Sequence, residues 1–179
     1  MTTLNVDGDQ DDRYREAASL YGAALERLAR AYEADDDWRR DLLQEIHLAL
    51  WRSFAGWDGR CSLRTWVYRV AHNAAASHVM RQRRRSAPVL VTLEELETRS
   101  DGVEAEASAG QREALDRLLG LVQQLKAVDR QVILSYLEGM DAAAIGEITG
   151  LAPGNVATKI HRIKALLSKR FHEGVRHAE

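Results

Sequence analysis

The sequence contains very little proline and cysteine. Among its 179 residues there are two prolines and one cysteine, Cys61. With so few helix breakers and so many Ala, Leu, Arg and Glu residues, the chain is expected to be mostly helical. A single cysteine excludes a disulfide within the chain and is too few for a thiolate zinc site. We therefore expect a protein of the reducing cytoplasm that carries no metal or cofactor.

The sequence also lacks a long apolar run. No stretch approaches the ~20 apolar residues that a helix needs to span a bilayer. The start, MTTLNVDGDQDD, is acidic and polar, unlike a signal peptide. The composition is that of an ordinary soluble protein, with 45% hydrophobic and 29% charged residues. No membrane contact is expected.

A net charge of −2 conceals an uneven distribution of charges. Residues 1–45 hold twelve acids and six bases, and residues 87–111 hold six acids and one base. By contrast, residues 61–86 hold six arginines, residues 152–170 hold five bases, and neither stretch holds an acid. Two separate basic surfaces suggest two contacts with a polyanion. The alternative is that these bases only complement the dipoles at helix ends. That could account for one such stretch, but it accounts less well for two.

Apolar residues at helical spacing predict three helices in the first half of the chain, at about residues 13–34, 38–54 and 63–85. The acidic triplet that begins at Asp35 offers an N-cap for the second helix, and Ser62 offers one for the third. The positions expected to face the core are Leu20, Ala24, Leu25, Leu28 and Tyr32, then Leu42, Leu43, Ile46, Leu50 and Phe54, then Leu63, Trp66, Val67, Val70 and Ala74.

Residues 87–111 differ from the rest in their proline, acidic bias, small residues and weak periodicity. We interpret them as a flexible linker with a short helical turn near residues 93–96. Helices are expected to resume at Arg112. The prediction is an all-α protein with two small helical domains, residues 10–86 and 112–175, joined by this flexible acidic linker.

Four helices are expected in the second domain. Asp129 begins the second of them, Asp141 caps the third, and Pro153 lies in the first turn of the last, where its missing N–H costs nothing. The apolar stripe of the first helix consists of Leu115, Leu118, Leu119, Val122 and Leu125.

The stretch from Gly146 to Arg170 has the spacing of a helix-turn-helix. Gly146 is a small residue where two helices would cross closely, and Gly150 supplies the tight turn four residues later. The expected core consists of Ile145, Ile148, Leu151, Val156, Ile160, Ile163 and Leu167. Small and polar residues lie on the opposite face, which suits a major groove. The alternative is a structural helix, with His161 merely exposed and Asn155 a local cap.

The third predicted helix interleaves aromatic residues with arginines. Trp66 is expected in the core, whereas Tyr68, Arg69, His72 and Asn73 are placed partly or wholly off the apolar stripe. Such a surface can stack unpaired bases while holding phosphates, and asparagine can read base edges. The alternative is an exposed, arginine-rich helix end.

Together these stretches resemble the bacterial RNA polymerase sigma factors, specifically the two-domain extracytoplasmic-function class. In the first domain the resemblance rests on DLLQEIHLALW (41–51), SLRTWVYRVAHN (62–73) and the arginine cluster. In the second it rests on QVILSYLEGMDAAAIGEITGLAPGNVATKIHRIKALL (131–167). The order, the spacing and the intervening linker match the family.

The resemblance implies two tasks for the first domain. One is docking on the clamp helices of the core polymerase, with Asp41, Gln44 and Glu45 as polar contacts. The other is recognition and opening of the −10 element, in which a base is flipped out of the duplex and the loop 57–61 sets the base preference. The residues assigned to the −10 element are Trp57, Arg60, Arg64, Arg69, Asn73, Arg81 and Arg84.

For the second domain the resemblance implies binding of duplex −35 DNA and contact with the polymerase flap. Thr158, His161 and Arg162 would face the groove, with Asn155 and Lys159 near phosphates. The linker would thread through the polymerase, and an anti-sigma partner is expected from the family. The polymerase, not this chain, would perform the covalent chemistry.

Two other classes are weighed against this interpretation. A helix-turn-helix regulator that binds DNA without joining the polymerase explains Gly146 to Arg170 but gives residues 41–51 and Asn73 no task. An enzyme is disfavoured because no His-Glu-x-x-His, phosphate loop or nucleophile elbow occurs.

Overall fold

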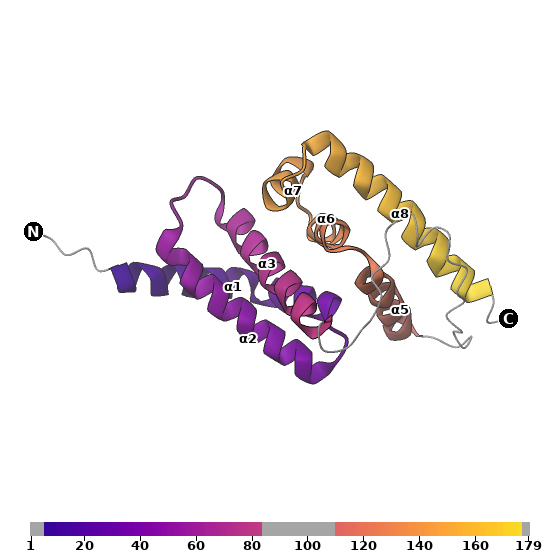
Figure 1. Ribbon diagram of the computed structural model, residues 1–179, viewed down its shortest axis with the longest axis horizontal. Coiled ribbons are helices and arrows are strands. Elements are labelled where there is room, and N and C mark those ends of the chain that lie inside the picture. Colours follow the sequence, from indigo (N-terminus) through magenta and orange to yellow (C-terminus); the bar gives the residue numbers. More distant parts are fainter. Residues whose placement is uncertain (1–5, 84–109, 177–179) are drawn as a thin grey trace, which may run out of the picture. The chain divides into compact units, whose positions relative to one another are not determined.

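The computed structural model describes residues 6–83 and 110–176 and divides the chain into two compact units (Figure 1). Unit 1 comprises Met1–Ser86 and unit 2 comprises Ala87–Glu179. Every regular element in the described ranges is a helix, which confirms the all-α prediction. Most of the predicted linker, with the turn near residues 93–96, lies outside the described residues. Within those ranges, no helix combines the length and apolar character needed to cross a membrane.

Unit 1 is a bundle of three long helices: α1 (Val6–Tyr32), α2 (Asp36–Ser53) and α3 (Leu63–Arg83), with the short 3-10 turn η1 (Phe54–Gly56) after α2 (Figure 1). Each long helix packs against the other two. The largest fully buried side chains of this unit are Leu25, Leu42, Ile46, Leu50, Phe54, Val67, Tyr68 and His72.

Both predicted caps of unit 1 are confirmed. The Asp35 carboxylate accepts hydrogen bonds from the backbone N–H groups of Asp37 (2.9 Å) and Trp38 (3.0 Å). The Ser62 hydroxyl accepts one from the N–H of Thr65 (3.1 Å). These contacts satisfy donors that have no partner within a helix, so they fix where α2 and α3 begin.

Two predictions for α1 were wrong: the residue at which the helix begins and the burial of Leu20. The helix begins at Val6 rather than near residue 13, and Leu20 is 62% exposed instead of facing the core. Acidic residues suit the N-terminal turns of a helix. Arg13 pairs with Asp9 (2.7 Å) and Arg15 with Asp12 (2.7 Å), which supports helix where the sequence was interpreted only as a polar start.

Unit 2 contains α5 (Gln111–Gln124), α6 (Ala127–Leu137), α7 (Ala142–Thr149) and α8 (Pro153–Arg176) (Figure 1). Asp141 caps α7 through the N–H of Ala144 (2.8 Å), and Pro153 is the first residue of α8, as predicted. The buried apolar side chains of this unit include Val122, Leu125, Ile133, Ile145, Val156 and Ile163. Leu115 is 45% exposed, so the predicted stripe of α5 was wrong at that position.

The turn between α7 and α8 depends on two glycines. Gly150 has φ +77°, in the left-handed region, and its N–H donates to the carbonyl of Gly146 (2.8 Å). A Cβ atom on Gly146 would lie 2.6 Å from the carbonyl oxygen of Leu151. The close approach predicted at Gly146 is therefore real, but the neighbour is the backbone of the turn rather than a crossing helix.

Candidate nucleic-acid interface

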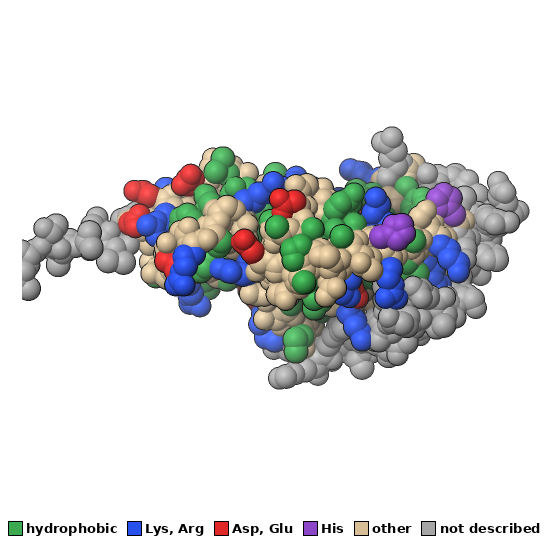
Figure 2. Space-filling model, turned by 90° about the horizontal axis from the view of Figure 1, so that it is seen from above, with side chains coloured by type: hydrophobic (Ala, Val, Ile, Leu, Met, Phe, Trp, Pro, Cys, Tyr) green, Lys and Arg blue, Asp and Glu red, His purple; other side chains and the backbone are tan. Residues whose placement is uncertain are grey.

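The outer face of α8 is polar and exposed. Beneath it, Val156 and Ile163 are fully buried, which fixes the face that α8 turns to the core of unit 2. The exposed residues on or beside the outward face are Asn155, Thr158, His161, Arg162 and Lys164. Figure 2 shows blue basic side chains and purple histidines close together on the side of α8. Helix packing thus presents small polar and basic groups in the manner that a groove-reading helix requires.

Lys159 differs from the other residues assigned to this face. Its Nζ lies 2.5 Å from Oδ1 of Asp129, and the Asp129 side chain is only 7% exposed. Asp129 lies in the first turn of α6, so the ion pair ties α8 to α6. The amine of Lys159 is directed to this carboxylate, so a phosphate would have to compete with Asp129 for it.

In α3 the predicted buried face was wrong. Tyr68 (2% exposed) and His72 (0% exposed) lie in the core, although both were placed off the apolar stripe. The hydroxyl of Tyr32 and Nδ1 of His72 share a hydrogen bond of 3.0 Å, which satisfies polar atoms inside the bundle. Asn73 is exposed, as base recognition would need. Arg84 lies outside the described residues.

Burial lowers the pKa of His72 from 6.5 to about 3. Between these values the unfolded chain binds a proton that the folded chain does not. Stability is therefore unaffected above about pH 6.5, falls as the pH drops below it, and stops falling near pH 3. Burial also lowers the pKa of His47, against an opposing charge from Glu26, so His47 acts in the same direction.

We expect unit 1 to lose on the order of 2 kcal/mol of unfolding free energy between pH 6.5 and pH 5 through His72. The four tryptophans all lie in unit 1, so urea unfolding followed by tryptophan fluorescence reports on this unit. His72→Gln should reduce the pH dependence, whereas His161→Gln in unit 2 should retain it. Equal slopes for wild type and His72→Gln would contradict the assignment.

Two arginines assigned to the −10 element, Arg64 and Arg69, lie against aromatic rings. The guanidinium carbon of Arg69 lies 4.7 Å from the Trp66 ring centroid, and Nη2 of Arg69 lies 3.8 Å from Sγ of Cys61. Arg64 lies 5.9 Å from the ring centroid of Tyr68. Trp66 is half-buried and donates from Nε1 to the Ser53 hydroxyl (2.9 Å). These contacts hold the basic side chains near the start of α3.

The loop before α3 contains two more of the assigned residues. Trp57 is partly buried, with its ring packed edge-on against Phe54 at 5.9 Å between centroids. Arg60 is exposed and forms an ion pair with Asp58. Hydrogen bonds from the backbone and side chain of Arg60 lower the pKa of Asp58. Phe54 and Asp58 therefore each restrain one residue of this loop.

Of the residues assigned to polymerase docking, Asp41 and Gln44 are exposed on α2. Glu45 forms an ion pair with Arg81 of α3, and its Oε1 lies 3.3 Å from Nδ1 of the buried His78. A predicted docking residue thus contacts a predicted −10 residue. Exposed pairs of this kind contribute only ~0–1 kcal/mol, so a partner could separate them readily.

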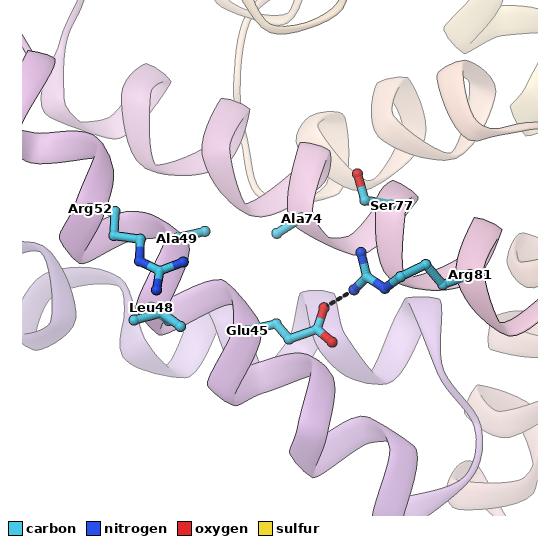
Figure 3. Close-up of a pocket in the computed structure, with 7 residues that line it drawn as sticks. All are labelled: Glu45, Leu48, Ala49, Arg52, Ala74, Ser77 and Arg81. Carbon is cyan, nitrogen blue, oxygen red and sulfur yellow. Dashed lines mark hydrogen bonds and ion pairs between the residues drawn. The ribbon is translucent and has the colours of Figure 1, made fainter.

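Both members of this ion pair line a pocket between α2 and α3 (Figure 3). Its lining residues are Glu45, Leu48, Ala49, Arg52, Ala74, Ser77 and Arg81. Arg52 and Ser77 were not among the predicted site residues. Arg52 falls seven residues after Glu45, two helical turns along α2, which was the available signal for placing it on this face.

Among the described residues, no group of three or more His, Cys, Asp or Glu side chains could hold a metal ion. One helical unit carries an arginine-bearing helix and the other carries a helix-turn-helix, and this combination is typical of DNA-binding proteins.

Comparison with known proteins assigns that class to a family. Residues 18–85 match the model of Sigma-70 region 2, and residues 115–167 match that of Sigma-70, region 4. The two matches together cover more than half of the 179 residues. The chain belongs to the sigma-70 family of RNA polymerase sigma factors, in the extracytoplasmic-function class.

Relatives extend over both units. The chain is 26% identical over 141 residues to the ECF RNA polymerase sigma-E factor of Haemophilus influenzae, covering 73% of each chain. It is 25% identical over 182 residues to the ECF RNA polymerase sigma factor SigW of Bacillus subtilis, covering 93% of this chain and 92% of SigW.

Two solved structures share the fold. CnrH, in complex with the cytosolic domain of CnrY, has a TM-score of 0.64 and 19% identity, over 92% of this chain and 90% of the other. RpoE of Bartonella quintana, in complex with the anti-sigma factor NepR, has a TM-score of 0.65 and 18% identity. The match covers 89% of this chain and 96% of RpoE.

Proposed function

We propose that the chain directs the core enzyme of RNA polymerase to specific promoters and starts transcription there. The observation that carries this proposal is the presence of both family regions on one chain, each in its own compact helical unit. The covalent chemistry is assigned to the polymerase, so this chain is not an enzyme. We propose that the protein acts in the cytoplasm, where the polymerase and the DNA are found.

The tasks are divided between the two units. We assign core docking and −10 opening to residues 10–86, and −35 recognition with flap contact to residues 112–175. Exposed Asp41 and Gln44 on α2 support the docking assignment, and exposed Asn73 on α3 supports the assignment to unpaired DNA. Residues 87–111 would join the two units as a linker.

An anti-sigma factor is proposed as a further partner. The two solved structures with this fold are complexes, one with the cytosolic domain of CnrY and the other with the anti-sigma factor NepR. Copurification of a bound inhibitor that blocks core binding would test this proposal for the present chain.

Reconstitution tests the proposed function directly. Core polymerase with this protein should give run-off transcripts from defined start sites on genomic DNA, and the two proteins should co-elute. Sequencing of the transcript 5′ ends then gives the promoter. Stable, sequence-specific DNA binding without the polymerase, and no transcription with it, would instead favour the regulator that acts alone.

Arg162→Ala is expected to weaken binding to the −35 element by about tenfold while core affinity stays unchanged, because a base-edge contact contributes ~1–3 kcal/mol. Titration of −35 duplexes with the preferred and a scrambled sequence measures the loss. Lys169→Ala is the matched variant on the same helix. A phosphate contact at Lys169 would weaken both duplexes alike and lower the salt slope by ~1. Equal promoter activity with and without Arg162 would remove it from the site.

A further inference from the structure

The start of α1 contacts the loop to which −10 base preference is assigned. Nη1 of Arg13 donates a hydrogen bond to the backbone carbonyl of Trp57 (3.3 Å). The guanidinium carbon of the same side chain lies 5.4 Å from the Trp57 ring centroid. Asp9 holds Arg13 from one turn earlier, with 2.7 Å between Oδ2 and Nη2. A single side chain thus restrains both the main chain and the ring of Trp57.

Neighbouring contacts fix α1 to the end of α2, from which the loop departs. Gln10 is buried, and its Nε2 donates to the carbonyl of Trp51 (2.7 Å). Nε1 of Trp51 donates to Oδ1 of Asp11 (2.8 Å). Because these bonds fasten the first turns of α1 beside the loop, the position of Arg13 is itself well determined.

The backbone N–H of Trp57 donates to the carbonyl of Phe54 (3.4 Å), but the side chain has little else to orient it by polar contact. Its Nε1 atom is buried and has no hydrogen-bond partner among the described residues. The ring is held by packing against Phe54 and by the cation above it. A cation over an indole face is attracted by the ring quadrupole, most strongly where water is partly excluded. Arg13 is therefore the charged group that fixes this ring.

Arg13 lies upstream of the segment that matches Sigma-70 region 2, which begins at residue 18. We propose that Arg13 is a positioning residue for −10 base selection. It fixes Trp57, and through Trp57 the shape of the loop 57–61 that would admit the flipped base. This inference rests on the proposed function and adds to it a specificity determinant on α1.

The experiment uses the full chain with core polymerase and the promoter identified by 5′-end sequencing. Templates carry each of the four bases at each −10 position of the non-template strand. Selectivity is the transcript yield with the preferred base divided by the yield with the best alternative. Arg13→Ala should lower this ratio about fivefold at the position read by the loop, with unchanged core affinity.

Arg15→Ala is the matched control. Arg15 lies two residues further along α1, is mostly exposed, and pairs with Asp11 and Asp12 within the same helix. Its removal should leave the selectivity ratio unchanged. Arg13→Lys keeps a charge near Asp9 but loses the planar group over the indole, so it should give an intermediate ratio.

The selectivity ratio of Arg13→Ala either supports or overturns the proposed role of Arg13. A wild-type ratio in Arg13→Ala overturns the proposal. So does an equal loss of transcription with all four bases, because that result shows a role in stability alone. A wild-type protein that gives no transcription with core polymerase refutes the proposed function itself, which separates the two failures.

Discussion

Gly146→Ala is expected to lower the unfolding free energy of unit 2 by about 2 kcal/mol and to remove most −35 binding. The new Cβ would lie 2.6 Å from the carbonyl oxygen of Leu151, a backbone atom in the turn between α7 and α8. That turn is held by Gly150 in the left-handed region and by its hydrogen bond to Gly146. Relief of the clash would shift the start of α8, which carries the proposed groove-reading residues.

Unit 2 contains no tryptophan, and both units are helical. A change in far-UV circular dichroism without a change in tryptophan fluorescence therefore reports on unit 2. Gly120→Ala is the matched control, because a Cβ there meets nothing within 4 Å and the residue lies inside α5. It should stabilise the unit by up to ~1 kcal/mol. Equal stability of Gly146→Ala and wild type would show that the turn adapts to the added atom.

Local signals predicted most of the helix boundaries, although α6 begins at Ala127 and not at Asp129. Asp35, Ser62 and Asp141 each cap the helix that follows them, and α7 spans residues 142–149 as expected. Caps, prolines and glycines act within a few residues of chain, so one sequence is enough to interpret them. The helix-turn-helix was predictable for the same reason.

Contacts between helices were harder to predict. The stripe assigned to α3 omitted Tyr68 and His72, which both carry polar atoms. For His72, the hydrogen bond with Tyr32 of α1 satisfies one of these atoms inside the core. Similarly, Lys159 was predicted to lie near phosphates, and its ion pair with Asp129 of α6 was not predicted. Such pairings join residues distant in sequence, and no spacing within one helix reveals them.

Arg130 is a further residue whose role could not be predicted, and its removal should strongly destabilise unit 2. It is 3% exposed, and its guanidinium donates to the carbonyls of Val122 (Nε, 3.2 Å), Gln123 and Leu125 (Nη2, 3.1 Å). The last four carbonyls of a helix have no partner within it. Arg130, on α6, supplies donors at the end of α5 and so joins these two helices.

Arg130→Met should lower the unfolding free energy of unit 2 by about 2–4 kcal/mol. The thioether chain fills similar space but leaves the buried carbonyls without their charged donor. Arg130→Lys should recover only part of the loss, because one amine cannot reproduce the planar fork. Circular dichroism gives the measurement, with the exposed Arg112→Met on α5 as the control expected to change little.

Since −35 binding needs a folded unit 2, the affinity for duplex should fall with the folded fraction as temperature rises. Loss of −35 affinity in Arg130→Met at a temperature where the unit is fully folded would instead mean that the α5–α6 joint sets the orientation of α8.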